Sequence, residues 1–287
     1  MTRQHLLASL SIGIGVIAVS PQAGASLVVH LDPNDLGSVF QDGGVSGGTV
    51  AVNAAGQPIG WIESQVNGFD AQQGLDAKPT LAEGPDAAGS PYVMNFNGSQ
   101  NLLMLDVNAT NISSPTTELD TDTMSIVLVG RVGSGGDGVD HFINFNYNTS
   151  DLVSIEYDHA TGNLIGRASG GSVSTAVGTD AYFVAELVWD SGNGLSFSVN
   201  GVSAGTDTSN ALAAANFSRF RIGDLASAGG TGTLLGDIGD VYIFNDATTD
   251  NTALVSQLMS DYNVVPEPGS LALLALGGLC AMRRRRS

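Results

Sequence analysis

The segment Leu195-Ser196-Phe197-Ser198-Val199-Asn200-Gly201 decides the fold class of this chain. Its apolar residues alternate with serines, which is the pattern of a strand with one buried face and one wet face. Asn200-Gly201 follows directly and favours a two-residue hairpin turn, because both residue types tolerate the positive φ angles of such turns. A strand that ends in a tight hairpin indicates antiparallel β structure.

Further strand candidates lie on both sides of this hairpin. Met124–Val132, Tyr182–Trp189 and Val241–Phe244 are richer in apolar residues and are predicted to be central strands. Arg219–Ile222 alternates like the hairpin strand. The chain contains 38 glycines, which supply turns between short strands. Neither a repeat nor a linker divides the region, so we expect one all-β sandwich domain over residues 26–263.

One helix is expected just before the C-terminal region. Between residues 250 and 262 the apolar side chains follow helical spacing, and Thr249 or Asp250 could cap the first turn. The residues that carry this pattern are Leu254, Val255, Leu258, Met259 and Tyr262. The helix should pack against the sandwich and lead into the tail.

The charge and the cysteine content exclude several functions. Between Ser26 and Val265 there are 27 acidic and 5 basic residues, so this region repels phosphate backbones and nucleic acid is not an expected partner. Solubility outside the cell accounts for the acidity, and calcium binding is the alternative. Cys280 is the only cysteine, so neither an intrachain disulfide nor a multi-cysteine metal site can form.

The N-terminus has the pattern of a secretory signal peptide over residues 1–25. Arg3 supplies a positive start, and an apolar helix-forming stretch covers residues 6–19. Ala23 and Ala25 then place small residues where a signal peptidase requires them, so cleavage is expected before Ser26.

The C-terminus, residues 264–287, carries three consecutive features. Pro266, Glu267 and Pro268 form a stiff, extended junction, and an apolar segment follows over residues 270–282. Arg283, Arg284, Arg285 and Arg286 close the chain. The apolar segment predicts a transmembrane helix, although it is shorter than the ~20 residues that usually span a bilayer. By the positive-inside rule the arginines place the C-terminus in the cytoplasm and the body outside.

This arrangement closely resembles the PEP-CTERM sorting tail of exported bacterial proteins. The resemblance implies recognition by an exosortase, a membrane enzyme that removes the helix, with Pro-Glu-Pro as recognition motif and the arginine cluster as retention signal. It also implies an inner-membrane intermediate that later reaches the cell surface or an extracellular matrix rich in polysaccharide. A simple membrane anchor is the alternative.

The body resembles the laminin-G-like domains of the concanavalin A-like lectin/glucanase family, which implies an antiparallel jelly-roll β-sandwich. The segments that carry the resemblance, in order, are 91–98, 124–130, 185–189, 197–201 and 238–245. β-Glucanases of this fold carry a Glu-x-Asp-x-(x)-Glu motif. A similar motif is present at Glu118-Leu119-Asp120-Thr121-Asp122, but its last position is Asp122, whose side chain is one methylene shorter than that of the catalytic glutamate. The stretch also follows a loop-like segment.

Laminin-G-like domains also often bind Ca²⁺ at the rim of the sandwich. Asp137, Asp140, Asp237 and Asp240 lie beside glycines and could supply oxygen ligands. Trp61 and Trp189 could stack on a sugar, although core packing is the expected role of Trp189. His141 and His159 do not form a metal motif.

Three functions compete. The expectation from sequence is a non-enzymatic surface protein whose sandwich binds extracellular polysaccharide or protein. A purely structural matrix protein is the alternative, and a glycan-cleaving enzyme of the jelly-roll glucanase type is the third hypothesis.

Overall fold

The computed structural model describes residues 27–42, 50–66, 69–73, 78–85, 91–106, 123–136, 138–147, 151–168, 170–209, 219–224 and 232–264. The signal peptide with its cleavage site, the tail from residue 265 onward, Asp137 and the segment 118–122 lie outside these ranges. In the described part no helix has the length and apolar character needed to cross a membrane.

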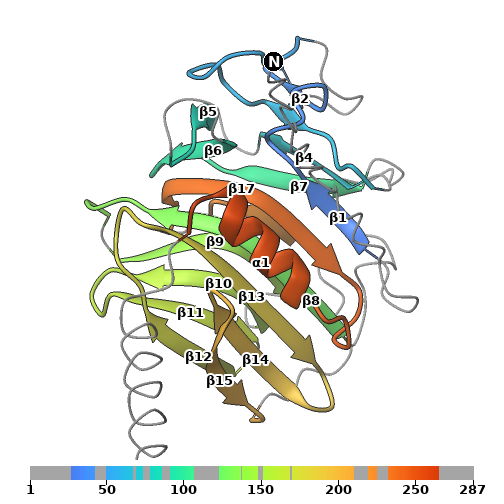
Figure 1. Ribbon diagram of the computed structural model, residues 1–287, viewed down its shortest axis with the longest axis vertical. Helices are drawn as coiled ribbons and strands as arrows, with labels where there is room; N and C mark the ends of the chain where they lie inside the picture. Colours follow the sequence, from blue (N-terminus) through green and yellow to red (C-terminus); the bar gives the residue numbers. More distant parts are fainter. Residues whose placement is uncertain are drawn as a thin grey trace, which may run out of the picture.

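Two antiparallel sheets form the domain (Figure 1). Sheet A runs in the order β15-β14-β13-β8-β17-β6-β5, with β1 also paired to β17. Its strands are β1 (Leu27–Leu31), β5 (Thr80–Glu83), β6 (Tyr92–Asn97), β8 (Thr123–Val132), β13 (Tyr182–Asp190), β14 (Gly194–Val199), β15 (Val202–Asp207) and β17 (Leu235–Phe244).

Sheet B runs in the order β12-β11-β10-β9-β16-β7-β4-β3-β2. Its strands are β2 (Val39–Phe40), β3 (Trp61–Ile62), β4 (Phe69–Gln73), β7 (Leu102–Asp106), β9 (Val139–Tyr147), β10 (Asp151–Asp158), β11 (Asn163–Ala168), β12 (Gly171–Ala176) and β16 (Arg219–Ile222). Strands distant in sequence are neighbours in both sheets, so the fold depends on long-range pairing.

The main core lies between the two sheets. It combines alternate residues of β8, β13 and β14 with alternate residues of β9, β10 and β11, and it contains large side chains such as Phe142, Phe145 and Phe197. Trp189 is fully buried in this core, and Trp61 is buried as well. The expected core role of Trp189 is therefore confirmed, and neither tryptophan is exposed to stack on a sugar.

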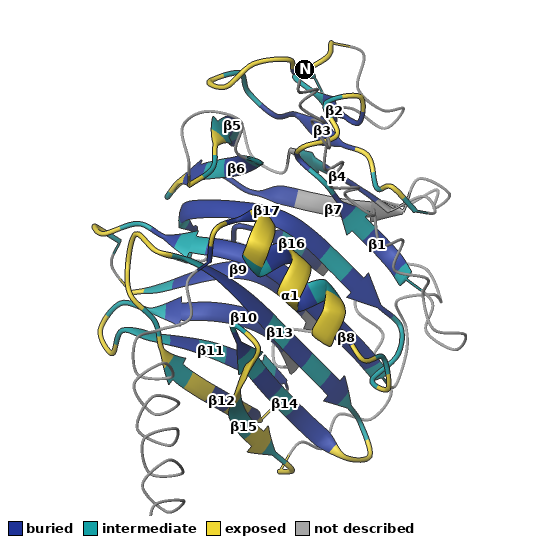
Figure 2. Cartoon of the chain, in the orientation of Figure 1, coloured by how far each residue is buried: buried dark blue, intermediate teal, exposed yellow. Residues whose placement is uncertain are grey.

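The single helix among the described residues, α1 (Thr252–Asp261), covers the outer face of sheet A (Figure 1). Val255 and Leu258 pack there in a second apolar cluster with Val127, Val129 and Val184. The opposite side of α1 faces solvent (Figure 2). Sheet A is consequently apolar on both faces where α1 lies, which explains why β8 and β17 lack simple alternation.

Several sequence expectations are confirmed in this architecture. β8, β13 and β17 are central strands, and the 250–262 helix exists. Asn200 and Gly201 turn with φ angles of 53° and 72°, as the hairpin requires. Asp250, one of the two expected capping residues, accepts a hydrogen bond of 3.0 Å from the Thr252 amide at the start of α1. The N-cap position itself is Asn251, which makes no side-chain cap bond and donates a hydrogen bond of 3.1 Å from its side-chain amide to Glu186.

Candidate functional site

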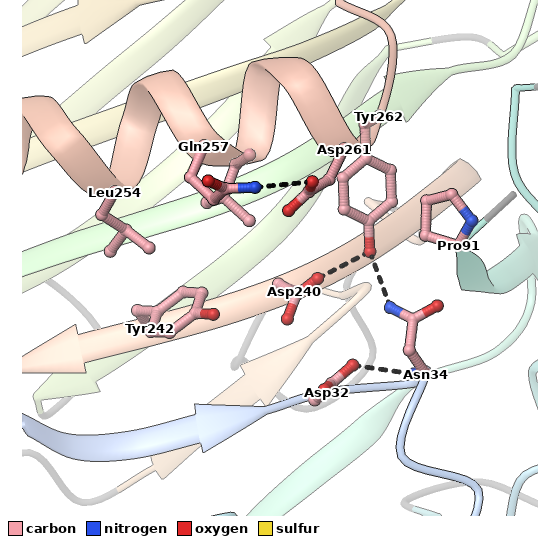
Figure 3. A pocket seen from close by; sticks show the side chains of 10 residues that line it. Asp32, Asn34, Pro91, Asp240, Tyr242, Leu254, Gln257, Asp261 and Tyr262 are labelled. Atoms are coloured by element: carbon pink, nitrogen blue, oxygen red, sulfur yellow. Dashed lines mark hydrogen bonds between the residues drawn. The ribbon is translucent and has the colours of Figure 1, made fainter. Parts of the chain in front are cut away.

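A pocket of about 440 Å³ opens where the C-terminal end of α1 meets the edge of sheet A (Figure 3). We call it the α1 pocket. It joins the end of β1, the start of β6, the middle of β17 and one side of α1. Its lining residues are Asp32, Asn34, Pro91, Asp240, Tyr242, Leu254, Gln257, Leu258, Asp261 and Tyr262.

Strand pairing explains why these residues meet. β1 is antiparallel to β17, with His30 opposite Tyr242 and Leu31 opposite Val241, so the chain brings Asp32 next to Asp240. The rings of His30 and Tyr242 stack with centroids 4.1 Å apart. Two segments separated by about two hundred residues therefore build one wall of the pocket.

Asp240 is the centre of the hydrogen-bond network (Figure 3). Its side chain is buried, and it accepts a hydrogen bond of 2.7 Å from the Tyr262 hydroxyl. His30 Nε2 lies 3.1 Å from its other oxygen. The side-chain amide of Asn34 donates a hydrogen bond of 3.3 Å to the Tyr262 hydroxyl. Gly239 makes this packing possible, because a Cβ atom there would lie 2.7 Å from the Tyr262 ring.

Burial and negative charge control protonation in the pocket. Burial raises the pKa of Asp32, and the neighbouring Asp240 charge adds to that effect. Burial and the same aspartates also raise the pKa values of the Tyr242 and Tyr262 hydroxyls. The tyrosines therefore remain hydrogen-bond donors at neutral pH, beside an aspartate that holds its proton more tightly than usual.

The pocket edge also has donors suited to a metal ion. His30, Asp32 and Asp240 place one potential ligand atom each within 4.8 Å of one another, the one such group among the described residues. An imidazole and two carboxylates fit several divalent cations.

Three of the four aspartates expected to bind calcium are described, and they have separate partners. An oxygen of Asp140 lies 2.9 Å from His159 Nε2. Asp237 accepts a hydrogen bond of 2.6 Å from Arg131 Nε and one of 2.7 Å from the Tyr182 hydroxyl. Of the three described members, Asp240 alone lines the α1 pocket. Asp137 lies outside the described residues. The expectation overlooked His30 and Asp32, although the pattern Val28-Val29-His30-Leu31-Asp32 shows polar residues in an otherwise apolar strand.

A second buried charge cluster lies on β10 and its neighbours, away from the pocket. Glu156 contacts Arg167 Nη2 at 2.5 Å and His141 Nε2 at 3.2 Å. Burial alone would raise the pKa of Glu156, but the hydrogen bonds from His141 and Arg167 outweigh it and lower the pKa to about 2. Its oxygens are engaged by these partners, which indicates a structural ion-pair cluster. His141 and His159 thus each pair with a carboxylate.

Comparison with protein families identifies the tail. Residues 264–286 match the PEP-CTERM protein-sorting motif. The motif indicates an exported protein with a C-terminal membrane-anchoring region, and it implies processing by an exosortase. No curated protein matches the sequence.

Comparison with solved structures identifies the fold class as that found in sialidases. Trypanosoma rangeli sialidase with 2,3-difluorosialic acid, a covalent intermediate, matches with a TM-score of 0.52 and 14% identity, over 86% of this chain and 35% of that one. The sialidase itself matches with a TM-score of 0.51 and 12% identity, over 86% and 34%. The chain therefore spans about a third of these enzymes. At this identity the likeness shows the fold alone.

These matches change two sequence expectations. The β-sandwich is supported, but the neighbours are sialidases and not specifically laminin-G-like or concanavalin A-like proteins. The expectation of a non-enzymatic body is contradicted by the two structures named above, which share its fold and are sialidases. The carboxylates of the α1 pocket come from the end of β1 and from β17, two strands distant in sequence, and the acidic stretch 118–122 gives no indication of them.

Proposed function

We propose that this exported protein, after processing by an exosortase, cleaves a neutral extracellular glycan in the α1 pocket. The observation that carries the proposal is the Asp32–Asp240 pair, two carboxylates within 4.8 Å of one another in a pocket of about 440 Å³. The sorting tail supports an extracellular site of action, and the sialidase-like fold supports a glycan substrate.

The lining of the pocket favours a neutral sugar over a charged one. Carboxylates and the side-chain amides of Asn34 and Gln257 can accept and donate hydrogen bonds to sugar hydroxyls. Pro91 and Leu254 add apolar surface, which suits the C–H face of a sugar ring. Among the described residues, three aspartates and no basic residue line the pocket, so the carboxylate of a sialic acid would be repelled.

The two carboxylates are suited to different roles. Asp32 is partly exposed and its pKa is raised, as expected of a general acid that protonates the leaving oxygen. Asp240 is buried and held by Tyr262 and His30, so it is suited to stabilise the positive charge that develops on the sugar ring. In retaining glycosidases the two carboxyl groups lie about 5 Å apart, and the upper limit of 4.8 Å between an oxygen of Asp32 and an oxygen of Asp240 is compatible with such a close pair.

The test is hydrolysis by the exported protein purified from its native membrane or medium. Release of reducing ends is measured on neutral α- and β-linked polysaccharides and on a sialylated oligosaccharide. We expect release from a neutral glycan, and a decrease of about 100-fold or more in kcat for Asp32→Asn, because it removes the acid but keeps the side-chain size.

Asp190→Asn provides the matched control, since Asp190 lies in a hairpin remote from the pocket and should leave the rate unchanged. No release from any neutral glycan by the wild-type protein would refute the proposal. An equal decrease in kcat for Asp190→Asn and Asp32→Asn would show that Asp32 has no specific role in the reaction.

A further inference from the structure

The folded body continues to Val264, the first residue of the region that matches the sorting motif and two residues before Pro266 of Pro-Glu-Pro. Tyr262, Asn263 and Val264, here called the junction segment, follow α1 directly. Tyr262 and Val264 are buried in the apolar cluster on the outer face of sheet A. The Val264 amide donates a hydrogen bond of 2.8 Å to the Met259 carbonyl, and the Tyr262 amide donates one of 3.0 Å to the Leu258 carbonyl. Val264 is therefore fixed by both its side chain and its backbone.

The junction segment is also bent. Asn263 has a φ angle of 48°, which lies in the left-handed region and reverses the chain against the end of α1. The Tyr262 hydroxyl reaches Asp240 in the α1 pocket. The segment that precedes the motif is thus turned and buried, not extended.

Chain length limits how far the motif can lie from this anchor. At 3.3–3.6 Å per residue, Glu267 lies within about 11 Å of the Val264 Cα atom. An enzyme that binds a peptide in an extended groove needs the backbone hydrogen-bonding groups on both sides of its recognition residues. On the N-terminal side of Pro266 those groups belong to Val265 and then to Val264, whose amide is already bonded to Met259.

We infer that release of the junction segment from the sandwich limits the rate at which the tail is removed. The inference rests on the proposed processing by an exosortase. When local opening and closing are fast, cleavage follows the population of the open form. Contacts that hold Val264 and Tyr262 in place then lower the population of the open form and slow removal of the tail. In this way the folded body regulates its own sorting.

The test is a pulse-chase measurement of tail loss for the full chain in a cell that contains the exosortase. We expect Val264→Ser to be processed about tenfold faster than wild type, which corresponds to about 1.4 kcal/mol of lost docking free energy. Val199→Ser is the matched control, because Val199 has the same 7% exposure in β14, in the core between the sheets. Equal acceleration by both variants would mean that general destabilisation is responsible and would overturn the inference.

A second variant leaves the folded body untouched. Eight glycine and serine residues inserted between Val264 and Val265 should give fast processing, and Val264→Ser should add nothing in that background. Processing of the insertion variant at the wild-type rate overturns the inference but not the role of the exosortase. Absence of tail loss in every variant, wild type included, overturns both.

Discussion

The hydrogen bond from Tyr262 to Asp240 is a short, buried contact of the α1 pocket, and Tyr262→Phe tests its contribution to stability. The hydroxyl is buried and lies 2.7 Å from the carboxylate. A hydrogen bond to a charged group contributes about 1.5–3 kcal/mol. After the substitution the buried Asp240 carboxylate, in a residue that is 6% exposed, keeps its contact with His30 but loses the hydrogen bond from the tyrosine hydroxyl. We expect the free energy of unfolding to fall by about 2 kcal/mol.

Thermal and urea unfolding measure this loss directly. For a domain of this size, 2 kcal/mol corresponds to a decrease in Tm of about 4–8 °C. Tyr92→Phe is the matched control, because the hydrogen bonds of Tyr92 to Asn34 and Tyr262 use its backbone, which the substitution keeps. It should change the free energy of unfolding by less than about 0.5 kcal/mol. A Tyr262→Phe protein as stable as Tyr92→Phe would refute the account of the network.

Two further predictions concern pH. Burial and nearby aspartates raise the pKa values of Tyr182, Tyr242 and Tyr262 above 10.0. Above pH 10 the native state therefore binds more protons than the unfolded state, and the free energy of unfolding should fall as the pH rises. The decrease is up to about 1.4 kcal/mol per pH unit for each tyrosine. Urea unfolding between pH 9 and 11 measures the slope, which Tyr182→Phe should reduce; a flat profile would contradict the prediction. Glu156, with a native pKa of about 2 against 4.5 when unfolded, should contribute about 3 kcal/mol above pH 4.5 and lose it as the pH falls to 2. Arg167→Met should therefore destabilise the protein at pH 5 much more than at pH 2.5, and an equal loss at both pH values would exclude this linkage.

Local patterns in the sequence were sufficient for strands β8, β13, β14 and β16, for the end of β17, for the hairpin and for the helix. Alternation at 195–199 predicts β14, and Asn200-Gly201 predicts its turn, because both signals depend on neighbouring residues alone. The spacing of Leu254, Val255 and Leu258 predicts α1 for the same reason. The two-sheet arrangement follows from many such strands with no helix between them.

The site could not be predicted in the same way. Asp240 and His30 lie 210 positions apart and meet because β1 pairs with β17. The aspartates near glycines resembled ligands at a loop, yet Asp237 and Asp240 lie on β17, a central strand that contains a bulge between Ile238 and Val241. The bulge alters the alternation of side chains along the strand, and periodicity alone does not reveal it.

The distribution of the few arginines also connects stability with ligand choice. Arg131, Arg167 and Arg221 lie within 2.7 Å of the buried carboxylates of Asp237, Glu156 and Asp224, respectively. Separating one of these arginines from its carboxylate leaves a buried charge unpaired, which is unfavourable, so the ion pairs oppose recruitment of these guanidinium groups by an anionic ligand. Because these three arginines are committed to ion pairs and the α1 pocket is lined by acids, the charge pattern that stabilises the sandwich also favours a neutral, hydroxyl-rich ligand.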